Sequence, residues 1–267
     1  MLGSSFQQFS PPDHTKKFRV IMGTERKSMS GFDIAAVLDG AWSLTKRQYW
    51  HWLLVIFVAI AIPVTIIIVG AIAAIAVPAL GAIVIFLGIL GFFYTFLGIL
   101  RNAYIASEGA KPSVGVLLRS DRYWWFLLAG LVYTGIVVVG LIAFIIPGLI
   151  LAFMFALFPY ALIGNPGMTG FAALAMSWEL ITTSFWRFIG FKIVLIGATV
   201  SLTVVAAVSQ SILIGGANDF NVLTSIVSVI AFILVLLVNV FVAAFTYLAE
   251  ALAYRRLSGD GEVVHLD

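Results

Sequence analysis

The chain has 267 residues, of which 62% are hydrophobic and 10% are charged, and it contains no cysteine. Soluble domains are roughly half apolar and about a quarter charged, so this composition excludes a soluble globular protein and indicates a polytopic membrane protein. The lack of cysteine excludes disulfides and thiolate chemistry. The formal charge of +3 is explained first by membrane topology, and we expect no nucleic-acid partner.

The chain divides into one membrane domain between two polar ends. Residues 1–31 are polar without apolar periodicity, which predicts a flexible cytoplasmic tail. The membrane domain is expected over 32–256, with amphipathic segments near 32–48 and 168–186 that lie along the interface. Residues 257–267 are expected to form a second cytoplasmic tail.

Long apolar runs predict an all-α fold, a bundle of six transmembrane helices arranged as three hairpins. Tight turns containing proline or glycine are expected within the hairpins at 78–81, 147–148 and 215–219. The expected spans are about 50–77, 82–105, 123–146, 149–163, 188–214 and 222–253.

The chain repeats itself. The stretch 41–52 returns in altered form as 177–188, and a weaker copy lies at 118–126. Each copy precedes an apolar run, and the return runs end near Tyr104, Tyr160 and Tyr254. The register match makes duplication the better explanation for the first and last copies. For the middle copy, the ordinary enrichment of Trp and Tyr at bilayer interfaces explains the likeness equally well.

Charge indicates the orientation. All fifteen Lys and Arg residues fall in the tails, in the two connections between hairpins or at adjoining span ends. The three tight turns carry none, and Asp219 is the only charged residue expected on the far side. Both termini are therefore predicted to be cytoplasmic.

No residue pattern predicts catalysis. His14, His51 and His265 form no metal-binding pattern, and no nucleophile elbow or phosphate loop occurs. We therefore expect no enzymatic activity, no metal and no cofactor.

Ionisable residues near the spans are the first candidate site, because charge in hydrocarbon is usually paired or functional. Arg101, Lys192 and Glu250 all lie near the predicted cytoplasmic ends of their helices. One hypothesis is an inner-leaflet ionic cluster in which Glu250 pairs with Arg101 or Lys192. The alternative is that each side chain reaches the headgroups by itself.

Other polar and aromatic residues suggest contacts rather than chemistry. Asn239, Gln210 and Ser209 lie deeper in the spans, where they line a polar pathway or form interhelical hydrogen bonds. A basic ring at the cytoplasmic face is expected to attract anionic lipid headgroups. The expected interfacial aromatic anchors are Trp42, Trp50, Trp52, Trp124, Trp125, Trp178 and Trp186.

These motifs resemble a known family. The second half of the chain resembles that of prokaryotic six-helix proteins related to the membrane domain of glycerophosphoryl diester phosphodiesterases. The motifs that carry this resemblance are Pro147-Gly148, Asn165-Pro166-Gly167, Ser177-Trp178-Glu179-Leu180 and Phe185 to Gly190. Ala41-Trp42 through Tyr49-Trp50 looks like the opening helix of that group. The resemblance implies a multi-pass protein of a prokaryotic plasma (inner) membrane. In the phosphodiesterase members the hydrolase chemistry belongs to a separate soluble domain, and we do not expect the short tails here to supply it.

Two functions follow as expectations. The first is a non-enzymatic membrane protein that acts as a scaffold or accessory subunit of a membrane complex, or that organises lipids. The alternative is a small transporter or lipid-handling protein that uses a cavity between the hairpins. The expected partners are membrane lipids, anionic at the cytoplasmic face, and partner membrane subunits.

Overall fold

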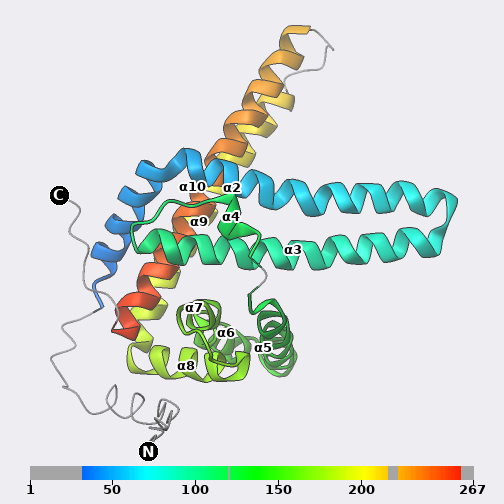
Figure 1. The fold of residues 1–267 in the computed structure, drawn as a ribbon. Helices are drawn as coiled ribbons and strands as arrows, with labels where there is room; N and C mark the ends of the chain where they lie inside the picture. Colours follow the sequence, from blue (N-terminus) through cyan, green and yellow to red (C-terminus); the bar gives the residue numbers. More distant parts are fainter. Residues whose placement is uncertain (1–31, 120, 216–221, 260–267) are drawn as a thin grey trace, which may run out of the picture. The chain divides into compact units, whose positions relative to one another are not determined.

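The computed structural model describes residues 32–119, 121–215 and 222–259 (Figure 1). In these ranges the chain is helical and contains no strand, which confirms the predicted all-α fold. The predicted N-terminal tail, Asp219 and the last eight residues of the C-terminal tail lie outside them. The helices are α2 (Ile34–Ala76), α3 (Pro78–Ser107), α4 (Val114–Leu117), α5 (Tyr123–Ala143), α6 (Ile145–Met154), α7 (Phe158–Gly164), α8 (Gly170–Thr183), α9 (Phe185–Gly215) and α10 (Val222–Ser258).

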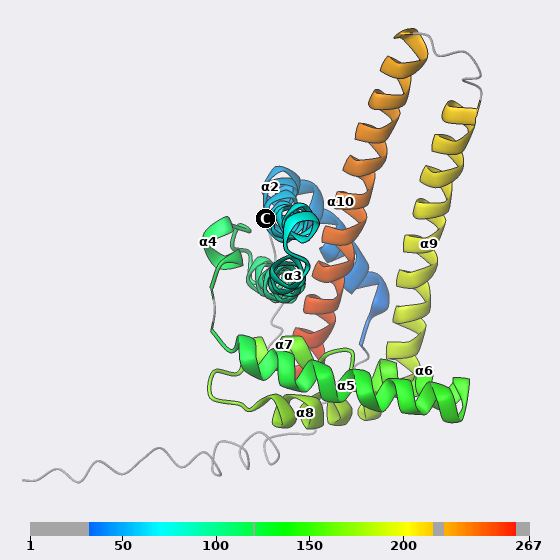
Figure 2. The same ribbon diagram turned by 90° about the vertical axis from the view of Figure 1, so that its right-hand side faces the viewer.

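Six helical segments in the described part of the chain are long and apolar enough to cross a bilayer, as the composition predicts. They pair as three hairpins: α2 with α3, α5 with α6, and α9 with α10 (Figures 1 and 2). The segments are Ile34–Ala76, Pro78–Ser107, Tyr123–Ala143, Ile145–Gly164, Phe185–Val205 and Ile226–Ser258.

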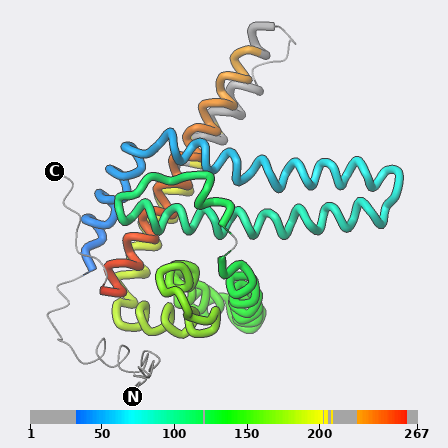
Figure 3. Tube along the Cα trace, in the orientation of Figure 1, coloured from blue at the N-terminus to red at the C-terminus, as the bar shows by residue number. Residues whose placement is uncertain are grey.

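The first hairpin is one long helix followed by a short reversal and a second helix (Figure 3). Asp33 starts α2 by accepting hydrogen bonds from the backbone N–H groups of Ala35 and Ala36. The segment near 32–48, expected to be amphipathic and to lie along the interface, forms the first part of α2. The helix also continues through Pro63, and it ends where Val77 is extended and Pro78 begins α3.

Glycines let the helices approach closely in this hairpin and at its flank, as Gly88 and Gly98 show. A Cβ atom built at Gly88 would lie 2.5 Å from the Ile67 side chain on α2. At Gly98 it would lie 2.3 Å from the carbonyl oxygen of Leu117, which is fully buried on α4. Small residues therefore set the packing distance here. Not every span glycine acts in this way, because a Cβ atom built at Gly130 or Gly135 on α5 would meet nothing within 4 Å.

Equivalent positions of the three repeats have equivalent environments, the middle copy included. Each copy contains a four-residue aromatic motif: Tyr-Trp-His-Trp at 49–52, Tyr-Trp-Trp-Phe at 123–126 and Phe-Trp-Arg-Phe at 185–188. The last residue of each motif is buried, whereas the second residue is 74%, 71% and 81% exposed in the three copies. This recurrence favours duplication over chance aromatic enrichment. The buried residues are Trp52, Phe126 and Phe188; the exposed ones are Trp50, Trp124 and Trp186.

The second amphipathic segment is the separate helix α8, capped by Thr169, whose side chain accepts a hydrogen bond from Ala172 N–H. The apolar spacing of Phe171, Leu174 and Trp178 predicts one buried stripe, but only Leu174 of these three is buried. Ala173, Ser177 and Ile181 are buried, whereas Phe171 and Trp178 are exposed. In a membrane protein, large apolar residues can face lipid while small ones pack between helices, which explains the difference.

Candidate functional site

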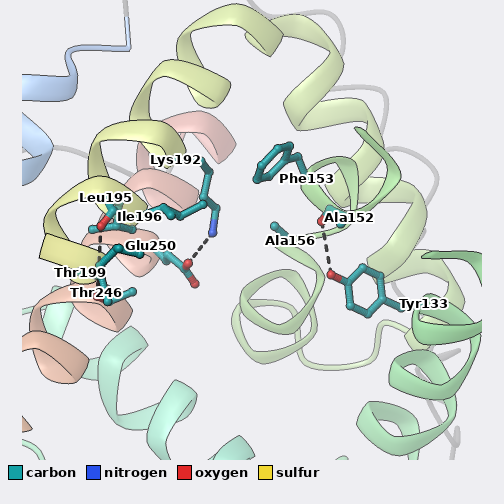
Figure 4. Close-up of a pocket in the computed structure, with 11 residues that line it drawn as sticks. Tyr133, Ala152, Phe153, Ala156, Lys192, Leu195, Ile196, Thr199, Thr246 and Glu250 are labelled. Atoms are coloured by element: carbon teal, nitrogen blue, oxygen red, sulfur yellow. Dashed lines mark hydrogen bonds and ion pairs between the residues drawn. The ribbon is translucent and has the colours of Figure 1, made fainter. Parts of the chain in front are cut away.

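A pocket of about 330 Å³ lies between the second and third hairpins and is partly open to the outside (Figure 4). Helices α5 and α6 supply one wall, and α9 and α10 supply the other. Most of the lining is apolar, with a small number of polar groups. The lining residues are Tyr133, Ala152, Phe153, Ala156, Lys192, Leu195, Ile196, Thr199, Val200, Thr246 and Glu250.

An ion pair sits in the wall formed by the third hairpin. Lys192 Nζ on α9 contacts Glu250 Oε1 on α10, and the two side chains are 10% and 17% exposed. The ammonium also lies 5.7 Å from the ring centroid of Phe188. At the rise of about 1.5 Å per residue, Lys192 lies roughly 10 Å along α9 from Phe185, inside the predicted span. The pair therefore places two opposite charges where hydrocarbon would otherwise penalise each of them.

Tyr160 on α7 connects this pair to the interior of the bundle. Its hydroxyl lies 3.1 Å from the Tyr247 carbonyl oxygen and 3.4 Å from Glu250 Oε2. The Tyr160 ring stacks on Tyr254 at 6.4 Å, and Tyr254 lies 6.3 Å from Tyr104. The tyrosines near the ends of the three return spans thus meet around one point.

The fourth span is broken beside the pocket. Helix α6 ends at Met154 and α7 begins at Phe158, and the pocket-lining Ala156 lies in the turn between them. Pro159 explains the break, because it has no N–H to donate to the carbonyl of Phe155 and its ring would clash with that carbonyl in a continuous helix.

Ser177 on α8 satisfies the backbone at this break. Its buried hydroxyl donates to the Met154 carbonyl oxygen at 2.9 Å and accepts from Leu157 N–H at 3.2 Å. Tyr133 on α5 donates to the Ala152 carbonyl oxygen at 3.4 Å, as Figure 4 shows. Non-helical backbone at membrane depth is tolerated where protein buries it or where it lines a cavity, and here both hold.

The three residues of the predicted ionic cluster separate into two groups. Lys192 and Glu250 come together, whereas Arg101 lies elsewhere. The Arg101 guanidinium donates to the backbone carbonyls of Arg119 and Asp121, both at 2.6 Å. It holds the connection between the first and second hairpins, because its position on α3 directs it to that loop rather than to α10.

Of the three predicted deep polar residues, the structure describes the side chain of Asn239. Asn239 is exposed on α10, and its Nδ2 donates to the Val235 carbonyl oxygen of the same helix at 2.8 Å. This bond lies within one helix, so the polar pathway and the interhelical contact both remain predictions for this residue. Gln210 and Ser209 belong to α9, but their side chains lie outside the residues described.

The tryptophan predictions need one correction. Trp52 is fully buried and therefore does not anchor the chain at an interface. It lies one turn after the buried Gln48, on the α2 face that packs into the core. The other predicted anchors, Trp42, Trp50, Trp124, Trp125, Trp178 and Trp186, are at least 39% exposed.

Sequence reasoning missed the broken helix, Ser177 and Tyr133. Pro159 is a signal for the break, but it is not a sufficient one, because Pro63 lies in a similar apolar run and α2 continues through it. A hydroxyl such as Ser177 could not have been assigned in advance, since its partners lie on a different helix and depend on how α8 packs.

Together the fold and the pocket define an all-α membrane protein with a charged, partly apolar pocket between helical hairpins. Among the described residues, no group of three or more His, Cys, Asp or Glu side chains is placed to hold a metal ion. No protein-family model, curated protein or solved structure matches the chain. The site's own geometry therefore carries the functional argument: it can bind a ligand through charge and apolar contact.

Proposed function

We propose that the protein is a lipid-handling membrane protein that holds an amphiphile in the pocket between its second and third hairpins. The observation that carries this proposal is the Lys192–Glu250 ion pair, placed in a pocket wall within the predicted spans. Charged groups at such positions commonly mark substrate sites, and apolar pockets with few polar groups are typical of ligand binding.

The broken fourth span adds support. Discontinuous membrane helices frequently form binding sites between structural repeats, and α6 and α7 separate beside the pocket. The lining also favours an amphiphile. Ile196 and Val200 line the pocket and are about half exposed, so they offer apolar contact to acyl chains next to the charged pair.

Retention of lipid after purification tests this function. The wild-type protein, extracted from its own membrane in mild detergent, is expected to keep about one tightly held lipid per chain in native mass spectrometry. Ala152→Trp fills the pocket and is expected to abolish that retention. Ala198→Trp is the matched control, because Ala198 is exposed on α9 and does not line the pocket. If both variants retained lipid equally, the bound lipid would be ordinary annular lipid that does not occupy the pocket.

The scaffold or accessory-subunit role is a second proposal, and Asn239 favours it. Its amide is exposed on a helix face otherwise built of large apolar residues such as Leu236 and Phe232. The amide uses one N–H within its own helix, and its second N–H and its carbonyl oxygen can pair with another helix. We propose that a transmembrane helix of a partner subunit covers this face.

Asn239→Leu tests the partner contact. Loss of a stoichiometric partner subunit from the variant, with retention in the wild type, would support it. Leu236→Ala is not expected to have that effect, because it leaves the amide in place. If instead the wild type purifies alone or as copies of itself, the accessory role is wrong.

We also propose that the protein lies in a prokaryotic plasma membrane with both termini in the cytoplasm. The resemblance to the six-helix prokaryotic family suggests a plasma (inner) membrane, and the distribution of Lys and Arg suggests cytoplasmic termini. Cleavage of a protease site placed at either terminus should occur only from the cytoplasmic side.

A further inference from the structure

The charges of the pocket balance each other. Its lining contains one cation, Lys192, and one anion, Glu250, and its other polar members are the hydroxyl residues Tyr133, Thr199 and Thr246. A ligand with a net charge would therefore leave one pocket charge without compensation. Unpaired charge in a low-dielectric site is unfavourable, so the pocket selects against such ligands.

Both charged groups retain hydrogen-bonding capacity. An ammonium has three donors, and among the described residues Lys192 uses one, to Glu250. Each carboxylate oxygen can accept more than one hydrogen bond. Within the part of the chain that the structure describes, Glu250 Oε2 has one contact, to the Tyr160 hydroxyl at 3.4 Å. Because the Tyr160 hydroxyl has one hydrogen and lies closer to the Tyr247 carbonyl oxygen, Oε2 is weakly satisfied.

We propose that the pocket recognises a zwitterionic headgroup that carries a phosphate and a protonated amine, as in phosphatidylethanolamine. The phosphate would contact Lys192 and the ligand amine would contact Glu250. Each protein charge would then be paired with an opposite charge of the ligand, and the net charge of the site would stay zero. This inference rests on the proposed lipid-handling function and assigns its headgroup class.

The size and edges of the pocket fit this assignment. A volume of about 330 Å³ is at the lower end of small-molecule pockets, which suits a headgroup rather than a whole lipid. The partly exposed Ile196 and Val200 lie beside it, where the chains of the lipid could leave toward the bilayer. Lys192 and Glu250 face the α6 side of the pocket across its open space in Figure 4.

Binding of defined lipids to the delipidated full chain tests the headgroup class. The probes are phosphatidylethanolamine, the anionic phosphatidylglycerol and a cationic lipid of the same chain length. For wild type we expect phosphatidylethanolamine to bind about tenfold or more tightly than either charged lipid, which corresponds to one well-made charge contact. Glu250→Gln should reverse the order in favour of phosphatidylglycerol, and Lys192→Met should favour the cationic lipid.

Two further variants keep the test decisive. The exchange Lys192→Glu with Glu250→Lys retains both charges and should retain the preference for phosphatidylethanolamine, even if the single variants fold poorly. Arg187→Met removes an exposed cation from the same helix and should change nothing. Equal wild-type binding of all three lipids, or a folded exchange variant without the preference, would overturn the inference.

Soluble phosphoethanolamine identifies the source of the headgroup. If it displaces bound lipid, the same chemistry is recognised in a free solute; if it does not, the acyl chains are required and the ligand is the membrane lipid. The experiment distinguishes failure of the headgroup assignment from failure of the proposed lipid-handling function. Lipid binding that Ala152→Trp abolishes but that ignores headgroup charge contradicts this inference alone, whereas binding that Ala152→Trp leaves intact contradicts the pocket itself.

Discussion

Arg122→Ala is expected to lower the free energy of unfolding by at least about 3 kcal/mol, because hydrogen bonds to charged groups contribute about 1.5–3 kcal/mol each. The Arg122 guanidinium donates to the carbonyl oxygens of Leu162, Asn165 and Met168. These carbonyls lie at and beyond the end of α7, where backbone acceptors lack partners within the helix. One side chain therefore ties the start of α5 to the end of the same hairpin.

The stability of Arg122→Ala reflects two effects, the lost hydrogen bonds and the backbone conformation at this position, and substitution by glycine distinguishes them. Its φ is 67°, in the left-handed region that L-residues other than glycine seldom adopt. Arg122→Gly is therefore expected to be about 1 kcal/mol more stable than Arg122→Ala, since glycine enters this region without the Cβ penalty. Arg122→Lys keeps the charge but not the planar fork, so it should be intermediate.

Thermal unfolding in one detergent measures this series, and Arg119→Met is its control because the Arg119 side chain is exposed. Burial lowers the pKa of Arg122 from its ordinary value, but an arginine remains protonated in proteins. The contribution of Arg122 should therefore be constant between pH 5 and 9. A stability for Arg122→Ala equal to that of Arg119→Met would show that the three carbonyls are satisfied in another way.

The fold was largely predictable because apolar length alone defines membrane-spanning helices. The three hairpins follow from that length, but the predicted turn positions were wrong for the first two. The chain reverses at Val77 and Phe144, whereas 78–81 and 147–148 lie in the first turns of α3 and α6. What the pattern did not define was continuity. The segment near 32–48 is continuous with its span because no helix breaker separates them. The fourth span is divided before Pro159, where Ser177 satisfies the backbone, whereas α2 continues through Pro63.

The sequence predicted candidate site residues only through their charge, because charged residues are rare in the spans. Lys192 and Glu250 stood out because few ionisable residues lie there, but Arg101 stood out equally. Which cation meets Glu250 depends on how α3, α9 and α10 rotate about their axes, and that rotation is decided by packing of small residues. Trp52 illustrates the same limit: a local aromatic motif does not say which of its rings will face the core.

Breaking the Lys192–Glu250 pair is the second change expected to have a large effect. Removing one partner of a buried ion pair leaves an uncompensated charge and typically lowers stability by about 3–5 kcal/mol. We expect losses of that size for Lys192→Met and for Glu250→Leu in the delipidated protein. The double variant should be much more stable than the sum of the single losses predicts, because it leaves no unpaired charge. Thermal or denaturant unfolding of the four proteins provides the cycle.

Two control variants show how much stability changes when an exposed surface charge is removed. Arg187→Met and Glu179→Gln each remove an exposed charge near the same helices, and together they should give additive changes within about 0.5 kcal/mol. Additive, small losses for Lys192→Met and Glu250→Leu would mean that each charge is independently solvated, as snorkelling predicts. Strong coupling would mean that the pair is desolvated in the pocket wall. In that case a ligand can separate the two charges only by offering each of them an opposite charge, since separation without such partners would incur the penalty that the single variants measure.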